Sequence, residues 1–200
     1  MSVPEGVLGP DGRKSAGDLK AGELWRYSLS SAMLARAVAV KAKVVDAQLV
    51  FTVGMVKDIG KVVLSQYVSE AYEKIRMLVD DSGYSFREAE AAVLGIDHAQ
   101  LGALVAQLWR FSPKMVDMIR YHHQPLQCQT VHQAAAVYMG DILCMMLGTG
   151  VGADGLAYRF QRQVVDLLRL SDTDIQMLLV EFTGQMDRLA GLFDSSYPRP

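Results

Sequence analysis

Apolar residues recur with the period of an α-helix along most of the chain. The clearest case follows Asp97, where apolar residues fall at positions i, i+3, i+4, i+7 and i+8: Leu101, Leu104, Val105, Leu108 and Trp109. Such a stripe is typical of an amphipathic helix. No segment shows the convincing alternation of apolar and polar residues that marks a half-buried strand. The pattern therefore predicts an all-α fold, a compact bundle of many helices with short connections.

Capping residues and helix breakers divide this pattern into separate helices. Ser85 and Glu88 make a capping box, and Ser112 before Pro113 gives a serine cap with proline in the first turn. We expect helices over 21–43, 47–57, 61–67, 69–81, 86–94, 130–147 and 158–170, with three more that begin at Asp97, at Ser112 and at Ser171.

The two ends of the chain lack this periodicity. Residues 1–20 hold several glycines and prolines, so we expect a flexible arm or linker there. We expect one helical domain over residues 21–194 and a loose tail over 195–200.

Composition excludes several classes of protein. Charged residues make up 21% of the chain and the net charge is −2, which argues against a protein that coats nucleic acid. No run of apolar residues is long enough to span a membrane, and the polar N-terminus lacks a signal peptide. The two cysteines form no CxxC motif and are expected to be reduced. We therefore expect a cytoplasmic protein that binds neither nucleic acid nor membrane.

Charged residues interrupt two strongly apolar segments. Lys57, Asp58 and Lys61 lie in FTVGMVKDIGKVVL, and Asp141 lies in AAAVYMGDILCMML. A buried charge is costly unless it is paired or bound. Asp141 therefore needs a partner, for which Lys57, Arg120, a histidine and a metal ion are candidates. The alternative for Lys57 is that its side chain simply extends to the surface from a helix end.

Three of the four histidines lie near helix ends. His98 is at the start of one expected helix, and His122 and His123 are at the end of the next. Adjacent helical residues point about 100° apart, so we expect that His122 and His123 do not both face one ion. Spacing alone leaves open which of them faces inward. It also leaves open that all three residues only cap helix ends through local hydrogen bonds.

The ordered series LWRYSLSSAMLARAVA, FTVGMVKDIGKVVL, GIDHAQLGALVAQLW, IRYHHQP and VYMGDIL resembles the HDOD domain. This is the HD-related output domain of bacterial signalling proteins, a relative of the HD and HD-GYP phosphohydrolases. The resemblance runs from about Leu24 to the final helix. HD-GYP enzymes carry a Gly-Tyr-Pro segment soon after the paired histidines; here that region reads QPLQCQT.

The resemblance implies a set of vestigial metal-site positions. HD enzymes hold a metal with a histidine of the first helix, a His-Asp doublet, further histidines and a late aspartate. By position these correspond to Tyr27, Lys57-Asp58, His98, one or both of His122 and His123, and Asp141.

Two of these positions are unsuited to a metal. The hydroxyl of Tyr27 has a reference pKa of about 10, which makes it a poor ligand near neutral pH. A protonated Lys57 only donates and cannot ligate. We hypothesise that the Lys57 ammonium takes the electrostatic place of the lost metal, with Asp141 as its partner and Asp58 as a further candidate.

The resemblance and these departures together predict a non-catalytic signalling domain, a pseudoenzyme that acts on a partner protein and needs no cofactor. The alternative is a metal-dependent phosphohydrolase or cyclic-dinucleotide phosphodiesterase with a remodelled iron, manganese or zinc site. Its ligands would come from Asp58, His98, His122, His123 and Asp141. A weaker third reading is a nucleotide-binding pseudoenzyme in which Arg120 and Lys57 meet phosphate.

The resemblance also implies a further helical lobe ahead of the HD-like part, whereas only about 20 loop-like residues precede Leu24. Without that lobe apolar surface would be exposed. We therefore expect the chain to form a homodimer or otherwise self-associate.

Overall fold

The computed structural model describes residues 23–67, 69–148 and 160–196. In these ranges the secondary structure is helical, no strand is present, and the predicted all-α class is confirmed. The elements are α1 Glu23–Lys41, α2 Ala47–Val56, α3 Ile59–Tyr67, α4 Ser69–Ser82, α5 Phe86–Leu94, α6 His98–Leu108, α7 Pro113–Arg120, the 3-10 helix η1 Pro125–Gln127, α8 Val131–Met146, α9 Arg162–Leu168 and α10 Asp172–Ser196.

The predicted capping residues fix several of these boundaries. The Ser85 side chain accepts the Glu88 N–H at 3.2 Å while Glu88 accepts the Ser85 N–H at 2.9 Å, so the capping box is present. Asp97 caps α6 by accepting the Gln100 N–H at 2.8 Å. Gly95 ends α5 with a φ of 73°, a left-handed conformation that favours glycine.

Some boundaries differ from the prediction. The helix expected over 158–170 is observed as Arg162–Leu168, and residues 149–159 lie outside the described part of the chain. α10 continues through Ser196, two residues into the segment expected to be a loose tail. The expected N-terminal arm, 1–20, and residues 197–200 lie outside the described residues.

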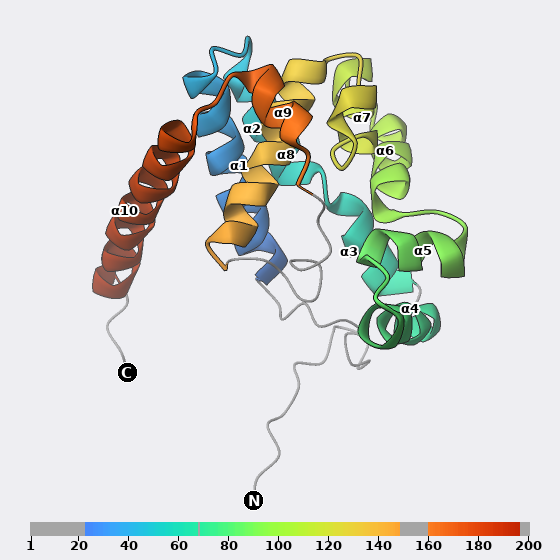
Figure 1. Ribbon diagram of the computed structural model, residues 1–200. Helices are drawn as coiled ribbons and strands as arrows, with labels where there is room; N and C mark the ends of the chain where they lie inside the picture. The colour runs from blue at the N-terminus through green and yellow to red at the C-terminus, as the bar shows by residue number, and fades with distance from the viewer. Residues whose placement is uncertain (1–22, 68, 149–159, 197–200) are drawn as a thin grey trace, which may run out of the picture.

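The core is built around α8, which is buried without interruption from Ala134 to Cys144. α1 lies directly against it (Figure 1). A Cβ added at Gly140 of α8 would come within 2.6 Å of the Cβ of Ala35 and of the Ser31 carbonyl oxygen on α1. The backbones therefore approach so closely that only glycine fits, and this contact brings the start of α1 beside Asp141.

α3 and α6 meet in a similar way. A Cβ added at Gly60 would lie only 2.0 Å from the carbonyl oxygen of His98. The first turns of both helices are therefore in backbone contact. This contact places the bend between α2 and α3 next to His98.

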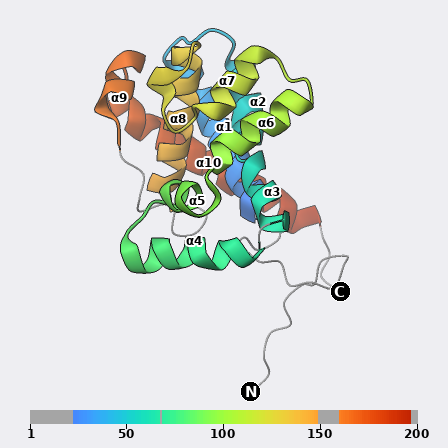
Figure 2. The ribbon, with the colours of Figure 1, turned by 90° about the vertical axis from the view of Figure 1, so that its right-hand side faces the viewer.

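The other helices surround this centre. α10 lies on one side, along α1, while α6 and α7 lie on the opposite side (Figure 1). A view turned by 90° shows α4 running below α5 at the lower end of the molecule (Figure 2).

The apolar stripe predicted on α6 is not its core face. Leu104 is 49% exposed, Leu108 79% and Trp109 56%. The buried face instead consists of His98 and small residues: Ala99, Gly102, Ala103 and Ala106. Small side chains let α6 pack closely on α3 and α7, which turns its large apolar residues outward.

Among the described residues no single helix has the length and hydropathy of a membrane span. Within the described ranges, one pair, α5 and α6, bent by 72°, meets these criteria when the two helices are counted together.

Candidate functional site

Lys57 and Asp58 occupy the bend between two helices. α2 ends at Val56 and α3 begins at Ile59, so the chain changes direction at these two residues. Lys57 is 1% exposed and Asp58 3% exposed. The alternative in which Lys57 extends to the surface is therefore wrong.

The Lys57 ammonium contacts two buried carboxylates. Its Nζ lies 2.9 Å from Oδ1 of Asp141 and also pairs with Oδ2 of Asp58. Asp141 additionally accepts hydrogen bonds from the hydroxyls of Ser31 at 2.6 Å and Tyr27 at 3.1 Å. The expected pairing of Lys57 with Asp141 is thus present. We call Tyr27, Ser31, Lys57 and Asp141 the lysine half of the site.

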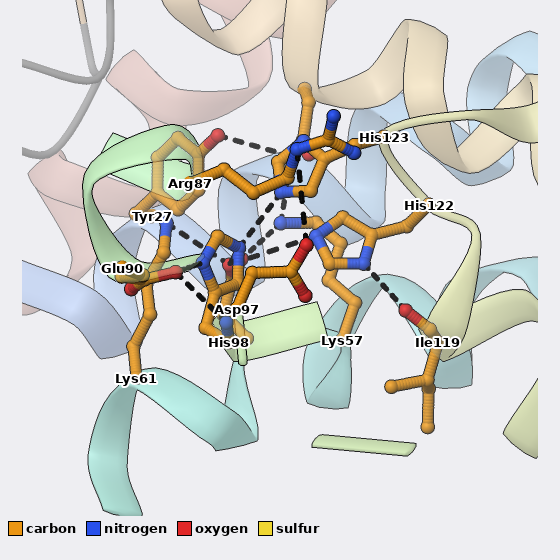
Figure 3. A network of polar contacts seen from close by, with 12 residues as sticks. Tyr27, Lys57, Lys61, Arg87, Glu90, Asp97, His98, Ile119, His122 and His123 are labelled. Carbon is orange, nitrogen blue, oxygen red and sulfur yellow. Dashed lines mark hydrogen bonds and ion pairs between the residues drawn. The ribbon is translucent and has the colours of Figure 1, made fainter. Parts of the chain in front are cut away.

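The imidazoles of His98, His122 and His123 gather in one place (Figure 3), and those of His98 and His122 lie near Oδ1 of Asp58. His98 begins α6, while His122 and His123 lie in the turn after α7. Their potential ligand nitrogens all lie within 4.8 Å of one another. Nε2 of His98 is 2.8 Å from Nε2 of His123. We call these three residues the histidine half.

Both adjacent histidines face the same site, which corrects the expectation that they would diverge. The ring centroids of His122 and His123 are 4.0 Å apart. Neighbouring side chains point about 100° apart only inside a helix, and α7 ends at Arg120, before the two histidines. The backbone of Tyr121, with φ −108° and ψ 18°, is no longer helical.

Hydrogen bonds fix the orientation of two of the rings. Oε2 of Glu90 accepts from the backbone N–H of His98 at 2.8 Å and from its Nδ1–H at 2.6 Å. The Nδ1–H of His122 donates to the Ile119 carbonyl at 2.7 Å. In both residues Nε2 therefore points toward Asp58. Oδ1 of Asp58 lies 3.7 Å from Nε2 of His98 and 4.0 Å from Nε2 of His122.

Comparison with known proteins identifies the family. A family model described as the HDOD domain matches residues 11–125, more than half of the 200 residues. The chain belongs to the HDOD family. The match ends before α8, so Asp141 is placed in the site by the fold rather than by this match. Comparison with curated proteins finds no match.

Solved structures share the HDOD fold. An HDOD domain protein of unknown function from Geobacter sulfurreducens is 21% identical, with a TM-score of 0.62, and the match covers 83% of this chain and 64% of that one. A candidate phosphohydrolase from Shewanella amazonensis is 22% identical, with a TM-score of 0.64 and coverage of 91% and 62%. A candidate signal transduction protein from Marinobacter aquaeolei is 20% identical, with a TM-score of 0.66 and coverage of 83% and 38%. This chain thus spans less than two thirds of the length of each.

The charges of the HDOD site stabilise one another. Burial would lower the pKa of Lys57, but Asp141 and Asp58 outweigh it and the pKa lies above its usual value. Burial would raise the pKa of Asp58, but the ammonium groups of Lys57 and Lys61 outweigh it and hold that pKa well below its usual range. Burial, helped by neighbouring positive groups, lowers the pKa values of His122 and His123 well below 6.5. These two imidazoles are therefore neutral at pH 7.

The two halves differ in their fitness for a metal ion. In the lysine half a buried ammonium lies between Asp58 and Asp141, and a donor-only cation there does not fit a metal. The histidine half offers convergent imidazole nitrogens, which suit zinc and similar ions. The seven site positions predicted from the sequence therefore lie in one network. Asp58 joins the lysine half of this network to the histidine half.

Sequence reasoning gave no role to three residues of the network. Ser31 lies one helical turn after Tyr27, so i, i+4 spacing could have placed it on the same face. Lys61 Nζ lies 3.1 Å from Oδ1 of Asp58, again at short helical spacing. Glu90 gives no such signal, because it resembles the other acidic residues of its helix and its burial follows only from the packing of α5 on the start of α6.

Proposed function

We propose that this HDOD chain is a non-catalytic domain of a bacterial signalling protein, which acts by binding a partner protein. The observation that carries the proposal is the buried Lys57 ammonium, held by Asp58 and Asp141. These are positions at which the resemblance to HD enzymes implies a metal. A hydrolytic mechanism of that kind depends on the metal to polarise phosphate and activate water.

The size of the repulsion supports this proposal. Two unit charges 4 Å apart interact by about 4 kcal/mol at an effective dielectric constant of 20. The Lys57 ammonium alone would therefore repel a divalent ion beside it by about 8 kcal/mol before relaxation. Loss of the Lys57 proton would not remove this repulsion near neutral pH, because the neighbouring carboxylates raise the pKa of Lys57 and keep it charged. We therefore expect no metal in the lysine half.

The experiment is a hydrolase assay with a rescue variant. The wild-type protein is incubated with Mn²⁺, Fe²⁺ or Zn²⁺ and with phosphomonoesters, nucleotides and cyclic dinucleotides. We expect no turnover above that of the Asp141→Asn variant. The double variant Tyr27→His, Lys57→His places metal-binding residue types in the lysine half. It should bind one metal ion more than the wild type does. Wild-type turnover that Asp141→Asn abolishes would overturn the proposal.

A metal-dependent phosphohydrolase or cyclic-dinucleotide phosphodiesterase is the second candidate. Its support is the convergence of three imidazoles beside Asp58, together with a fold shared with the candidate phosphohydrolase from Shewanella amazonensis. Iron, manganese or zinc would be the cofactor in that case. The same assay separates the two candidates.

Partner binding would use exposed apolar surface. Leu104, Leu108 and Trp109 present large apolar side chains on the outer side of α6. A second copy of the chain is the simplest partner of this kind, and we propose self-association through this surface. Light scattering should show a dimer that Leu108→Asp weakens; a wild-type monomer at high concentration would contradict this part of the proposal.

A further inference from the structure

We propose that Gln161 couples the buried site to α9, so that a shift of the turn that carries His122 and His123 is passed to α9 and to the start of α10. Gln161 is a positioning residue in this inference and binds no ligand. The inference goes beyond the proposed function, because it concerns a connection within the domain and holds whether or not the domain is catalytic.

Gln161 bonds to two separate parts of the fold. Its backbone N–H donates to the hydroxyl of Tyr138 at 3.2 Å, and its side-chain Nε2 donates to the backbone carbonyl of His123 at 3.1 Å. Tyr138 lies on α8, about one helical turn before Asp141, and His123 belongs to the histidine half. We call these two hydrogen bonds the Gln161 link. The link joins α9 to both halves of the site.

The His123 carbonyl follows the packing of the imidazoles. Nε2 of the His123 ring lies 2.8 Å from Nε2 of His98, and its ring centroid lies 4.0 Å from that of His122. Two rotatable bonds join this ring to its backbone, which gives it little freedom to adjust alone. A displacement of the neighbouring rings would therefore move the His123 backbone, and the carbonyl that accepts from Gln161 would move with it.

α9 depends on its contacts with the rest of the fold. It has seven residues, whereas an isolated helix shorter than about 12 residues is marginal in water. Val164 and Leu168 are buried and hold α9 against the core, on α8 (Figure 1). The side chain of Gln161, the N-cap residue, does not cap the first turn and bonds to His123 instead. Loss of the link should therefore loosen the first turn of α9.

The position of α9 also affects the start of α10. Arg169 ends α9 with a φ of 52°, and Ser171 then accepts the Asp174 N–H at 3.2 Å in the first turn of α10. Oδ1 of Asp174 lies 2.7 Å from Nζ of Lys41 at the end of α1, in an exposed ion pair. Exposed ion pairs contribute little stability, so this one resists a displacement of α10 only weakly.

The side-chain bond of the link is suited to reversible opening. It is only partly buried, so water can satisfy the Gln161 amide and the His123 carbonyl when they separate. Opening then costs about as much as the loss of one ordinary hydrogen bond. Removal of this bond should raise the population of the open state about fivefold.

Amide hydrogen exchange of the full chain, resolved by residue with NMR, tests the inference. The Val164 N–H donates to the Gln161 carbonyl at 3.0 Å and reports on α9. The Gln124 N–H donates to the Tyr121 carbonyl at 2.8 Å and reports on the turn that carries the two histidines. Gln161→Met keeps the side-chain length but removes the donor, and it should speed exchange at both amides about fivefold. Gln163→Met, on the exposed side of the same helix, is the matched control and should change neither.

A double-variant cycle separates coupling from the local stability of α9. His123→Ala removes the ring that contacts His98 but keeps the backbone carbonyl. With Gln161 present, this variant should speed exchange at Val164 at least about twofold. In the Gln161→Met background it should have no further effect. Equal effects in both backgrounds are additive and would overturn the inference.

Two conservative variants test the donor itself. Gln161→Glu has the same shape but cannot donate to the His123 carbonyl, so exchange at Gln124 should become faster. A role confined to α9 predicts no such increase, because a carboxylate at a helix N-terminus favours the helix. Gln161→Lys keeps a donor of sufficient length and should leave exchange at Gln124 within about twofold of the wild type.

If His123→Ala fails to fold, the Gln161 variants decide alone. Faster exchange at Gln124 in Gln161→Met and Gln161→Glu, but not in Gln163→Met, supports the inference. Unchanged exchange at Gln124 in Gln161→Met overturns it, since the two residues then do not communicate. Failure of the coupling leaves the non-catalytic proposal intact, whereas metal-dependent turnover defeats that proposal and not this one.

Discussion

Replacing Lys57 by methionine removes the central charge of the network while nearly preserving side-chain volume. Breaking a buried ion pair costs about 3–5 kcal/mol, because the partner charge stays buried. Asp141 would keep the hydroxyls of Tyr27 and Ser31, and Asp58 would keep Lys61. We therefore expect the lower end of this range, about 3 kcal/mol, which lowers the melting temperature by about 6–12 °C for a chain of this size.

Urea and thermal unfolding followed by circular dichroism measure this loss. Lys114→Met on the exposed start of α7 is the control and should change stability by less than about 0.5 kcal/mol. Adding Asp141→Asn to Lys57→Met removes the orphaned charge, so the double variant should be more stable than the sum of the single effects by about 2 kcal/mol. If Lys57→Met were no more harmful than Lys114→Met, the ammonium would not be holding the carboxylates together.

Three further predictions concern pH, packing and thiol reactivity. The folded-state pKa values of His122 and His123 lie well below 6.5, so unfolding takes up protons below about pH 6.5. With chelator present, these two histidines should leave the free energy of unfolding unchanged between about pH 7 and pH 8. Well below pH 6.5 it should fall by up to about 2.7 kcal/mol per pH unit, with about half that slope in His122→Asn; equal slopes would refute the assignment. Gly60→Ala forces a methyl group against the His98 carbonyl and should lower the free energy of unfolding in urea by about 3 kcal/mol. This loss should be at least twice that of Gly102→Ala, where the nearest atoms to an added methyl group are 3.3 Å away. Burial raises the pKa of Cys128 to about 11, and its thiol donates to Asp117 at 3.1 Å. At pH 8 the Cys128 thiol of folded protein should therefore react with iodoacetamide far more slowly than that of urea-unfolded protein. Comparable rates would contradict the protection of this thiol.

The sequence predicts this fold well where local chemistry decides. Ser85, Asp97 and Ser112 mark helix starts because a side-chain oxygen satisfies the free N–H groups of the first turn. The pairing of Lys57 with Asp141 could also be predicted, because a charge in an apolar helix needs an opposite charge nearby.

Other features depend on packing that no local pattern reveals. Periodicity shows which residues of α6 share a face, but not which face is covered; Gly102 and its small neighbours determine that by close approach to α3. The convergence of His122 and His123 arises from the turn at Tyr121, whose geometry does not follow from spacing. The role of Glu90 can be recognised only from the packing of α5 against His98.

The close approach of Gly140 to Ala35 limits how this domain can move. At this contact a sliding motion between α1 and α8 would press the Gly140 backbone against Ala35 and the Ser31 carbonyl, because glycine has no side chain that could adjust. The separation of the α1 and α8 backbones that carry Tyr27 and Asp141 is thereby set by main-chain contact. A conformational change in this domain would therefore keep α1 and α8 together and move the helices around them.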